Sequence, residues 1–180
     1  MRNKLMLQTL QDEQHIVWID ADVVELSKNI MQTMISHAEQ NPDVGLITAR
    51  CEQNQMDNYD KNAWKVNSPS LAGPIPDDSR DKSVEELVNT RIMVPQLIEN
   101  TSDTDLVPLD SVGGTILYIR ADLIWQGVSF PTKNVVGTTW SQAGWIGVET
   151  EGICYMAKGL KGGGCYVLGG GHHVRHTDWG

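Results

Sequence analysis

The sequence lacks the features that would assign it at once to a familiar class. It has no stripe of lysine and arginine, because 14 basic side chains stand against 23 acidic ones, for a formal net charge of −9. Nucleic-acid binding depends on clustered positive charge, so the composition argues against DNA or RNA as a partner. The sequence also contains no signal peptide and no apolar run long enough to span a membrane.

Cysteine is scarce as well. Cys51, Cys154 and Cys165 form an odd, scattered set without the paired spacing of a metal site. The default prediction is three buried thiols, which would say little about the cellular compartment. What the chain does have is 40% hydrophobic content over 180 residues. This is enough for one globular domain, 1–180, with a proper core.

One short stretch, residues 15–22, organises the pattern around it. An unbroken apolar run at 16–19 stops at Asp20-Ala21-Asp22. Such a run predicts a strand buried on both faces, as in a parallel sheet. Because side chains alternate along an extended chain, we expect Asp20 and Asp22 to point the same way. Two carboxylates at the carboxyl end of a strand would bind a hard divalent cation, which in turn would hold a phosphorylated substrate.

The charge distribution agrees with this hypothesis. Residues 1–110 carry 19 acidic and 9 basic side chains, whereas residues 111–180 carry 4 and 5. An acidic protein that handles a diphosphate needs a cation to neutralise it.

The D-x-D pattern occurs twice, and the two copies differ in context. With 14 aspartates in the chain, about one copy is expected by chance. The second copy, Asp103-Thr104-Asp105, lies in a polar stretch with no strand before it. We predict that this copy is a solvated loop, so the metal hypothesis belongs to the first copy alone.

Local patterns predict the order of the elements. We predict a helix at 2–10, followed by a strand at 16–20. This strand, a helix capped by Ser27 and a strand at 44–49 form a β-α-β unit, which predicts a parallel pair of strands. The stretch 52–82 is a long polar loop. Ser83-Val84-Glu85-Glu86 reads as a capping box that starts a helix. Further elements are a strand at 115–119, a helix at 148–157 and a strand at 165–168.

Two pairs of residues are candidates for contacts with a sugar. Gly113 and Gly114 precede a strand and permit close approach of the backbone to a ligand, although a plain turn or bulge explains them equally well. Trp140 and Trp145 lie in a glycine-rich loop. Tryptophans usually fill cores, but on an exposed loop they suit stacking against sugar rings.

Two further groups carry titratable side chains. Glu149 and Glu151 begin a helix, where they serve either the helix dipole or a site. His172, His173 and His176 follow the last strand. A lone histidine is more often structural, but one member of this group would suit the metal of the first D-x-D copy.

Four blocks, at 18–25, 109–115, 149–152 and 174–176, together resemble the fungal Golgi mannan-polymerase α-mannosyltransferases, glycosyltransferase family 62. Their order and rough spacing also match, over nearly the whole chain. The resemblance implies a GT-A-like α/β fold with a mostly parallel sheet flanked by helices. It implies retaining transfer from GDP-mannose to a mannan or N-glycan acceptor, a manganese ion, a place on the lumenal side of the Golgi membrane, and related mannosyltransferase subunits as partners.

The resemblance also assigns roles to residues. Asp20 and Asp22 correspond to the metal and diphosphate motif, and His176 corresponds to the C-terminal metal ligand. The residues that fall where the family lines its sugar and acceptor pocket are Asp110, Glu149 and Glu151, with Gly113 and Gly114 beneath the acceptor.

Two features of the family are not found in these 180 residues: a membrane anchor and a preceding β-α-β half that grips the guanosine. We therefore expect a fragment without the N-terminal nucleotide-binding portion. The strand at 16–20 should then have one free edge, or an edge covered only by the helix at 2–10. Such an edge tends to recruit other chains, so we expect the isolated chain to associate and to show no mannosyl transfer.

Two alternatives come from other classes. A phosphatase of the haloacid dehalogenase type also places D-x-D after an apolar strand, but Val23-Val24-Glu25 stands where a threonine-containing turn is expected. Its lysine and second carboxylate pair would have to be Lys82 and Asp77-Asp78, which lie in the polar loop. The other alternative is a non-catalytic subunit that keeps the fold and binds partners without turnover.

Overall fold

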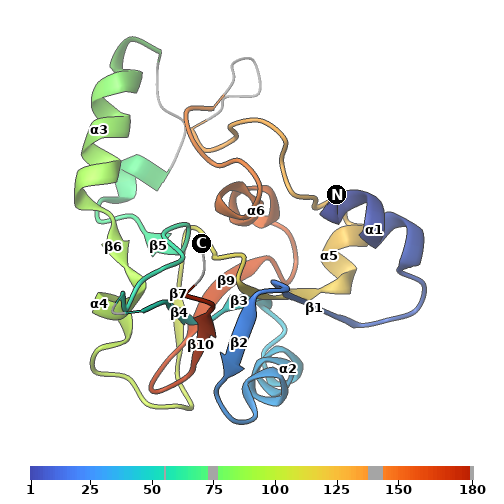
Figure 1. Ribbon diagram of the computed structural model, residues 1–180. Helices are drawn as coiled ribbons and strands as arrows, with labels where there is room; N and C mark the ends of the chain where they lie inside the picture. Colours follow the sequence, from blue (N-terminus) through green and yellow to red (C-terminus); the bar gives the residue numbers. More distant parts are fainter. Residues whose placement is uncertain (55, 73–76, 138–143, 179–180) are drawn as a thin grey trace.

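The computed structural model describes residues 1–54, 56–72, 77–137 and 144–178, which form an α/β fold (Figure 1). The helices are α1 (Arg2–Thr9), α2 (Ile30–Gln40), α3 (Arg80–Thr90), α4 (Val94–Ile98), α5 (Ala121–Trp125) and α6 (Thr150–Ala157). The strands are β1 (His15–Ile19), β2 (Val23–Leu26), β3 (Val44–Thr48), β4 (Arg50–Glu52), β5 (Trp64–Lys65), β6 (Ile92–Met93), β7 (Leu106–Pro108), β8 (Ile116–Arg120), β9 (Gly164–Leu168) and β10 (His173–His176).

The main sheet is mixed, with the strand order β1-β8-β3-β9-β7. Among neighbouring strands of this sheet, only β3 and β9 form a parallel pair. Strand β8 pairs antiparallel with both β1 and β3, and β7 pairs antiparallel with β9. The expectation of a mostly parallel sheet is therefore wrong. So is the expected pairing of β1 with β3, because β8 enters between them. The β-α-β pattern indicated that the two strands run in the same direction, but it carried no information on a strand that arrives 70 residues later in the chain.

Strand β1 lies at the edge of this sheet. It was predicted to be buried on both faces, but its residues are only partly buried or exposed, so this prediction is wrong. Its last residue, Ile19, is 39% exposed. No described strand pairs with the side of β1 that faces away from β8. On the face of the sheet that α1 covers, Met6 and Leu10 pack in the same apolar cluster as Ile16 and Trp18. Helix α1 thus packs on a face of β1, and the outer edge of β1 has no partner strand in the described part of the chain, which is the first of the two expected arrangements.

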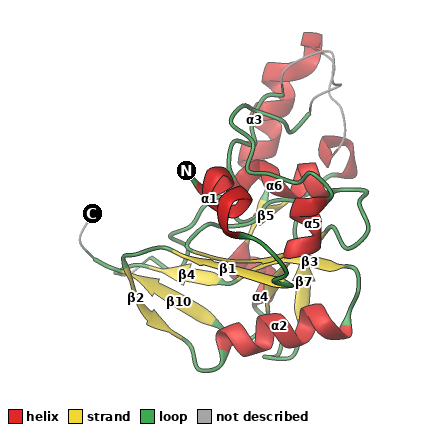
Figure 2. Ribbon diagram, turned by 90° about the vertical axis from the view of Figure 1, so that its right-hand side faces the viewer, coloured by secondary structure: helices red, strands yellow, loops and turns green. Residues whose placement is uncertain are grey.

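Helices cover both faces of the sheet (Figure 2). Alternate residues along β3 and β8 supply the two faces, because side chains of a strand point to opposite sides. Leu46 and Leu117 pack against α1, α5 and α6, whereas Ile47 and Tyr118 pack against α2. A smaller sheet, ordered β2-β10-β4, adjoins the α2 side. Its strand β2, which directly follows the first D-x-D copy, was not predicted.

The stretch 52–82 has more structure than a polar loop. Trp64, in β5, is 1% exposed and pairs with Met93 of β6. Helix α3 begins at Arg80, three residues before the predicted cap at Ser83, and its N-cap is Ser79. The capping-box pattern was therefore misleading, since local spacing alone did not fix the start of the helix. None of the helices in the described part of the chain combines the length and apolarity needed to cross a bilayer.

The cysteines are not three free thiols. Cys154 of α6 and Cys165 of β9 form a disulfide, and only Cys51 is free and buried. The prediction failed because the turn at 158–163 folds β9 back beside α6, which brings together two residues that the sequence separates by 11 positions.

Candidate functional site

The first D-x-D copy forms a turn between β1 and β2. The backbone N–H of Val23 donates to the carbonyl oxygen of Asp20 at 3.2 Å, so the chain does not stay extended through these residues. The two carboxylates therefore find different partners. Asp20 Oδ1 lies 3.0 Å from Arg2 Nη2, and Asp22 Oδ2 lies 2.9 Å from His176 Nε2.

Arg2, the first residue of α1, bridges two carboxylates from distant parts of the chain. Besides Asp20, its Nη1 donates to Glu149 Oε1 at 3.1 Å. The guanidinium carbon also lies 5.8 Å from the ring centre of Trp18 and 5.4 Å from that of Phe130. Arg2 was not among the predicted site residues. A lone arginine near the start of a helix carries no signal of this role.

Burial and neighbouring charges both shift the pKa of Asp20. Partial burial raises the pKa of this carboxyl above its ordinary value, because a charged group loses hydration there. The positive charge of Arg2 opposes that shift, while the negative charges of Asp22 and Asp60 add to it. The net direction of the pKa shift is upward, because the loss of hydration outweighs the stabilisation that Arg2 provides.

His176 is the one histidine of its group that joins this site. It is 7% exposed, and its ring centre lies 4.5 Å from that of Tyr59. Its Nδ1 lies 3.3 Å from Gln53 Nε2, on the side of the ring away from Asp22. His172 instead contacts the backbone oxygen of Asp103, and His173 lies 3.9 Å from Glu25.

Asp60 shapes the glycine pair that precedes β8. Its Oδ2 accepts hydrogen bonds from the backbone N–H of Gly114 at 2.6 Å and from Thr115, both from the backbone at 3.1 Å and from the hydroxyl at 3.2 Å. A Cβ atom at Gly113 would lie 2.5 Å from the same oxygen. The close approach that the glycines permit is thus an approach to Asp60. Sequence reasoning missed this residue because it lies in a polar stretch 53 positions before Gly113.

A cavity of about 390 Å³ opens beside these groups. It is lined by Arg2, Asp20, Tyr59, Asp60, Lys61, Asn62, Gly114, Thr115, Glu149, Thr150 and His176. The volume falls within the range of small-molecule sites. The walls carry carboxylates from three separate segments, so the cavity suits a cation or a ligand rich in hydroxyl groups.

Glu149 and Glu151 face different surroundings although they are two residues apart. Glu149 lines the cavity and, as the residue before α6, has a backbone φ of 57°, a strained region for a non-glycine residue. Glu151 Oε1 accepts from Trp64 Nε1 at 3.2 Å, and the same oxygen lies 3.7 Å from Arg91. Its other oxygen accepts from the backbone N–H of Gly147 at 3.1 Å. Glu151 therefore holds the start of α6 against neighbouring segments.

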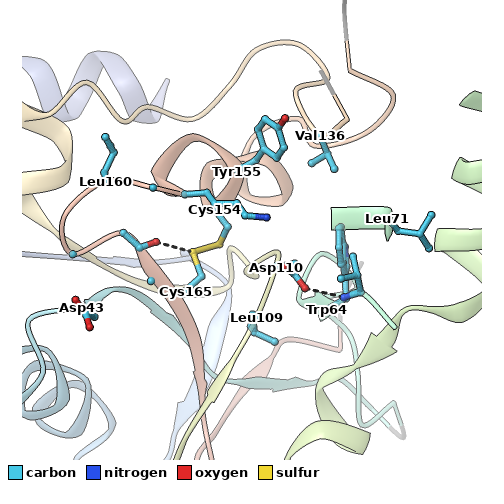
Figure 3. Close-up of a pocket in the computed structure, with 16 residues that line it drawn as sticks. Asp43, Trp64, Leu71, Leu109, Asp110, Val136, Cys154, Tyr155, Leu160 and Cys165 are labelled. Atoms are coloured by element: carbon cyan, nitrogen blue, oxygen red, sulfur yellow. Dashed lines mark hydrogen bonds between the residues drawn. A yellow bond between two sulfur atoms is a disulfide. The ribbon is translucent and has the colours of Figure 1, made fainter. Parts of the chain in front are cut away.

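Asp110 lies in a second cavity, of about 320 Å³ (Figure 3). Its Oδ2 accepts from the backbone N–H of Val66 at 2.9 Å. The surrounding walls include Leu109, Trp64 and the Cys154–Cys165 disulfide. The residues that the resemblance assigned to one sugar pocket are thus divided: Gly114 and Glu149 line the first cavity, and Asp110 lines the second.

Of the two predicted sugar-stacking tryptophans, Trp145 is not among the residues that line the first cavity. Trp145 packs against the small apolar cluster of Trp64, Leu71 and Leu87. Trp140 lies outside the described residues.

The residues can be tested for their fit to a metal ion. In the part of the chain that the structure describes, no three side chains of histidine, cysteine, aspartate or glutamate are arranged to hold one. Asp20, Asp22 and His176 offer suitable oxygen and nitrogen donors, but Asp20 is engaged by Arg2, and Asp22 and His176 engage each other. Cys51 is no candidate, since burial raises the pKa of its thiol to about 11. The donor chemistry fits a cation, which would have to replace these contacts.

The second D-x-D copy is an exposed loop, as predicted. Asp105 Oδ2 accepts from the backbone N–H of Ser102 at 2.7 Å and from its hydroxyl at 2.8 Å. Asp103 Oδ1 accepts from the backbone N–H of Gly171 at 2.8 Å. Asp105 thus shapes its own loop, whereas Asp103 connects the loop to the chain at Gly171.

The chain is similar to known proteins along most of its length. The sequence model of the family described as Anp1 matches residues 1–134. The chain is 32% identical over 176 residues to the mannan polymerase complex subunit mnn9 of Schizosaccharomyces pombe, an alignment that covers 93% of this chain and 48% of that protein. It is 29% identical over 168 residues to the mannan polymerase complex subunit MNN9 of Candida albicans, covering 88% and 43% respectively. The chain thus spans about half the length of these curated relatives.

Proposed function

The chain belongs to the Anp1 family, and from this premise we propose that it is the D-x-D-bearing part of a mannosyltransferase. The proposed reaction is retaining transfer of mannose from GDP-mannose to a mannan or N-glycan acceptor, with manganese as the cation. Both relatives are named as subunits of a mannan polymerase complex, which supports this assignment at the level of the family.

One observation carries the proposal to particular residues. The turn after β1 places Asp20 in the wall of a cavity of about 390 Å³, and Asp22 pairs with His176 of β10 at 2.9 Å. Asp20, Asp22 and His176 would hold the cation. When bound, Mn²⁺ would neutralise the negative charge of the diphosphate as the donor breaks.

The remaining residues of the cavity would bind and orient the sugar. Carboxylate oxygens accept hydrogen bonds from sugar hydroxyls, and Glu149 presents such an oxygen to the cavity. Its strained backbone supports a functional role, since such strain concentrates at functional sites. Asp60 fixes the backbone of Gly114 and Thr115 in the facing wall. In this proposal Glu149, rather than Glu151, contacts the substrate, and Asp110 contacts whatever part of an acceptor reaches the second cavity.

We further propose that the chain works in the Golgi lumen beside related mannosyltransferase subunits. The names of the relatives suggest the complex. The disulfide between Cys154 and Cys165 suits an oxidising compartment of the secretory pathway, since disulfides are rare in reducing compartments.

A second candidate function is that of a non-catalytic subunit. It is favoured by the word "subunit" in the names of both relatives and by the side-chain contacts that already engage the candidate metal ligands. The phosphatase alternative has less support. Its nucleophile would be Asp20, which here is held by Arg2, and Lys82 is an exposed residue of α3.

A transfer assay separates these functions. We would measure labelled mannose passed from GDP-mannose to an α-mannobiose acceptor, with Mn²⁺ and with EDTA, for the chain alone and for the chain fused to an upstream nucleotide-binding half. In the fused form we expect Mn²⁺-dependent transfer that Asp22→Asn removes and Asp103→Asn leaves intact. Transfer that survives Asp22→Asn would overturn the metal assignment. Stable binding to a second subunit without transfer by any form would favour the non-catalytic role.

A further inference from the structure

The strongest unexplained feature of the cavity is the position of Arg2. This side chain donates from one nitrogen to Asp20 at 3.0 Å and from another to Glu149 at 3.1 Å. A third contact, to the carbonyl oxygen of Gly114, measures 3.4 Å. An arginine fork with bonds to two carboxylates and a carbonyl places a positive charge directly on these carboxylates, while the other cation of the wall, Lys61, is exposed.

The surrounding structure holds Arg2 in this place. Its side chain is 20% exposed and lies near the rings of Trp18 and Phe130. The next residue, Asn3, donates to the carbonyl oxygen of Phe130 at 2.8 Å and accepts from the N–H of Phe130 at 2.8 Å. These two bonds fix the first turn of α1 against the chain at 130. Arg2 is therefore presented to the carboxylates by a defined scaffold.

The position runs against the local preference of the helix. A positive charge in the first turn of a helix faces the positive end of the helix dipole, which destabilises it. Helix α1 has no acidic residue in its first turn to compensate. The compensation comes from outside the helix, from Asp20 and Glu149. This long-range pairing indicates that the charge serves the cavity.

From this geometry we infer that Arg2 is a tethered counter-ion that competes with the divalent cation for Asp20. The inference rests on the proposed metal site and goes beyond it. With no cation bound, the guanidinium bonds to both Asp20 and Glu149. A cation that binds Asp20 Oδ1 displaces Arg2 from that oxygen. Release of Arg2 would also free Glu149 to accept hydrogen bonds from a ligand.

Direct measurement of metal binding tests the competition. The affinity for Mn²⁺ alone can be measured from the electron paramagnetic resonance signal of the free ion, without any assay of activity. We expect Arg2→Gln to bind Mn²⁺ about fivefold more tightly than the wild type, because a partly exposed ion pair is worth up to about that factor. Arg2→Lys keeps the charge but cannot span both carboxylates, so its affinity should fall between the two.

Lys4 provides the matched control, since it is an exposed basic residue of the same helix. Lys4→Gln removes the same charge from α1 and should leave the Mn²⁺ affinity unchanged. Equal Mn²⁺ affinities for wild type and Arg2→Gln would overturn the proposed competition but would leave the proposed metal site intact. Weaker binding by Arg2→Gln would also overturn it and would show that Arg2 assists the cation. Absence of Mn²⁺ binding by all variants would overturn the metal site and the competition together.

Discussion

The two D-x-D copies of this chain have the same chemistry and different surroundings. Asp20 and Asp22 contact residues that lie far away in the sequence, Arg2 and His176. Asp105 instead bonds to Ser102 of its own loop. Both copies have long-range contacts, since Asp103 accepts from the backbone N–H of Gly171. The first copy contacts an arginine and a histidine side chain, whereas the second bonds to backbone groups and to a hydroxyl of its own loop. The comparison teaches that the role of such a motif depends on which side chains its carboxylates contact.

The copies also differ in the direction of their pKa shifts. Burial raises the pKa of Asp20, because its charged form loses hydration. The backbone and hydroxyl hydrogen bonds of Ser102 lower the pKa of Asp105, because they stabilise the charged form. One copy therefore carries a carboxylate in an unfavourable environment and the other a carboxylate in a favourable one. An unfavourable environment for a charged group is typical of functional sites.

The largest expected effect on stability is that of replacing Asp60, whose carboxylate holds the backbone of the cavity wall opposite the first copy. Asp60→Ala removes the acceptor of two backbone N–H groups and one hydroxyl at Gly114 and Thr115. We expect the free energy of unfolding to fall by about 3 kcal/mol, because partly buried donors are left without partners. Urea denaturation measures the change. Asp105→Ala, in the exposed second copy, should cost clearly less; equal losses would show that the two loops do not differ in this way.

A somewhat smaller effect on stability is expected from Mn²⁺ binding, which should depend on the first copy and not on the second. At a Mn²⁺ concentration 100 times the dissociation constant, the folded state gains about 2.7 kcal/mol, which corresponds to a rise in Tm of roughly 5–10 °C. We expect Asp22→Asn to abolish this rise and Asp103→Asn to preserve it. Thermal unfolding with and without Mn²⁺ measures both. The metal-free stability of Asp22→Asn should fall by less than about 1 kcal/mol, because the side chain of Asp22 is 51% exposed. A preserved rise in Asp22→Asn would contradict the assignment.

The smallest expected effect is a difference in the sign of the pH dependence of stability. Urea unfolding between pH 3 and 6 in EDTA measures it. The folded-state pKa of Asp20 is raised, so the folded state binds the proton more tightly and this residue lowers stability as pH rises through that window. The folded-state pKa of Asp105 is lowered, so its contribution is present above the ordinary pKa of aspartate and is lost as pH falls. Relative to the wild type, Asp20→Asn should gain stability as pH rises, and Asp105→Asn should lose it. Slopes of the same sign would refute the contrast between the copies.

Local patterns were sufficient for much of the secondary structure. The apolar run at 16–19 formed β1, the run at 44–49 formed β3, and the apolar spacing at 30–38 formed α2. These predictions held because each depends on residues close together in the chain. The exposed second copy was predictable for the same reason, since its polar neighbours give it no apolar surface to bury.

The candidate site was predictable only in part. The D-x-D turn, Glu149 and His176 were singled out from the sequence, and they lie around one cavity or beside it. Arg2 and Asp60 were missed, because each acts through a partner more than 17 positions away. The sequence also did not show that Glu149 and Glu151 have different surroundings. Both are acidic residues at the start of a helix, and only the position of Trp64 and Arg91 shows which one is engaged elsewhere.

The sequence by itself determined where strands and helices form and which residues carry the chemistry of carboxylates and imidazole. The tertiary structure decided which strands are neighbours, which cysteines are bonded and which charges meet. Strand β8 entered between β1 and β3, Cys154 met Cys165, and Arg2 met Asp20 and Glu149. The physical reason is that helix and strand propensity act within a few residues. Strand pairing, disulfide formation and ion pairing depend instead on contacts between segments whose separation in sequence says nothing about their separation in space.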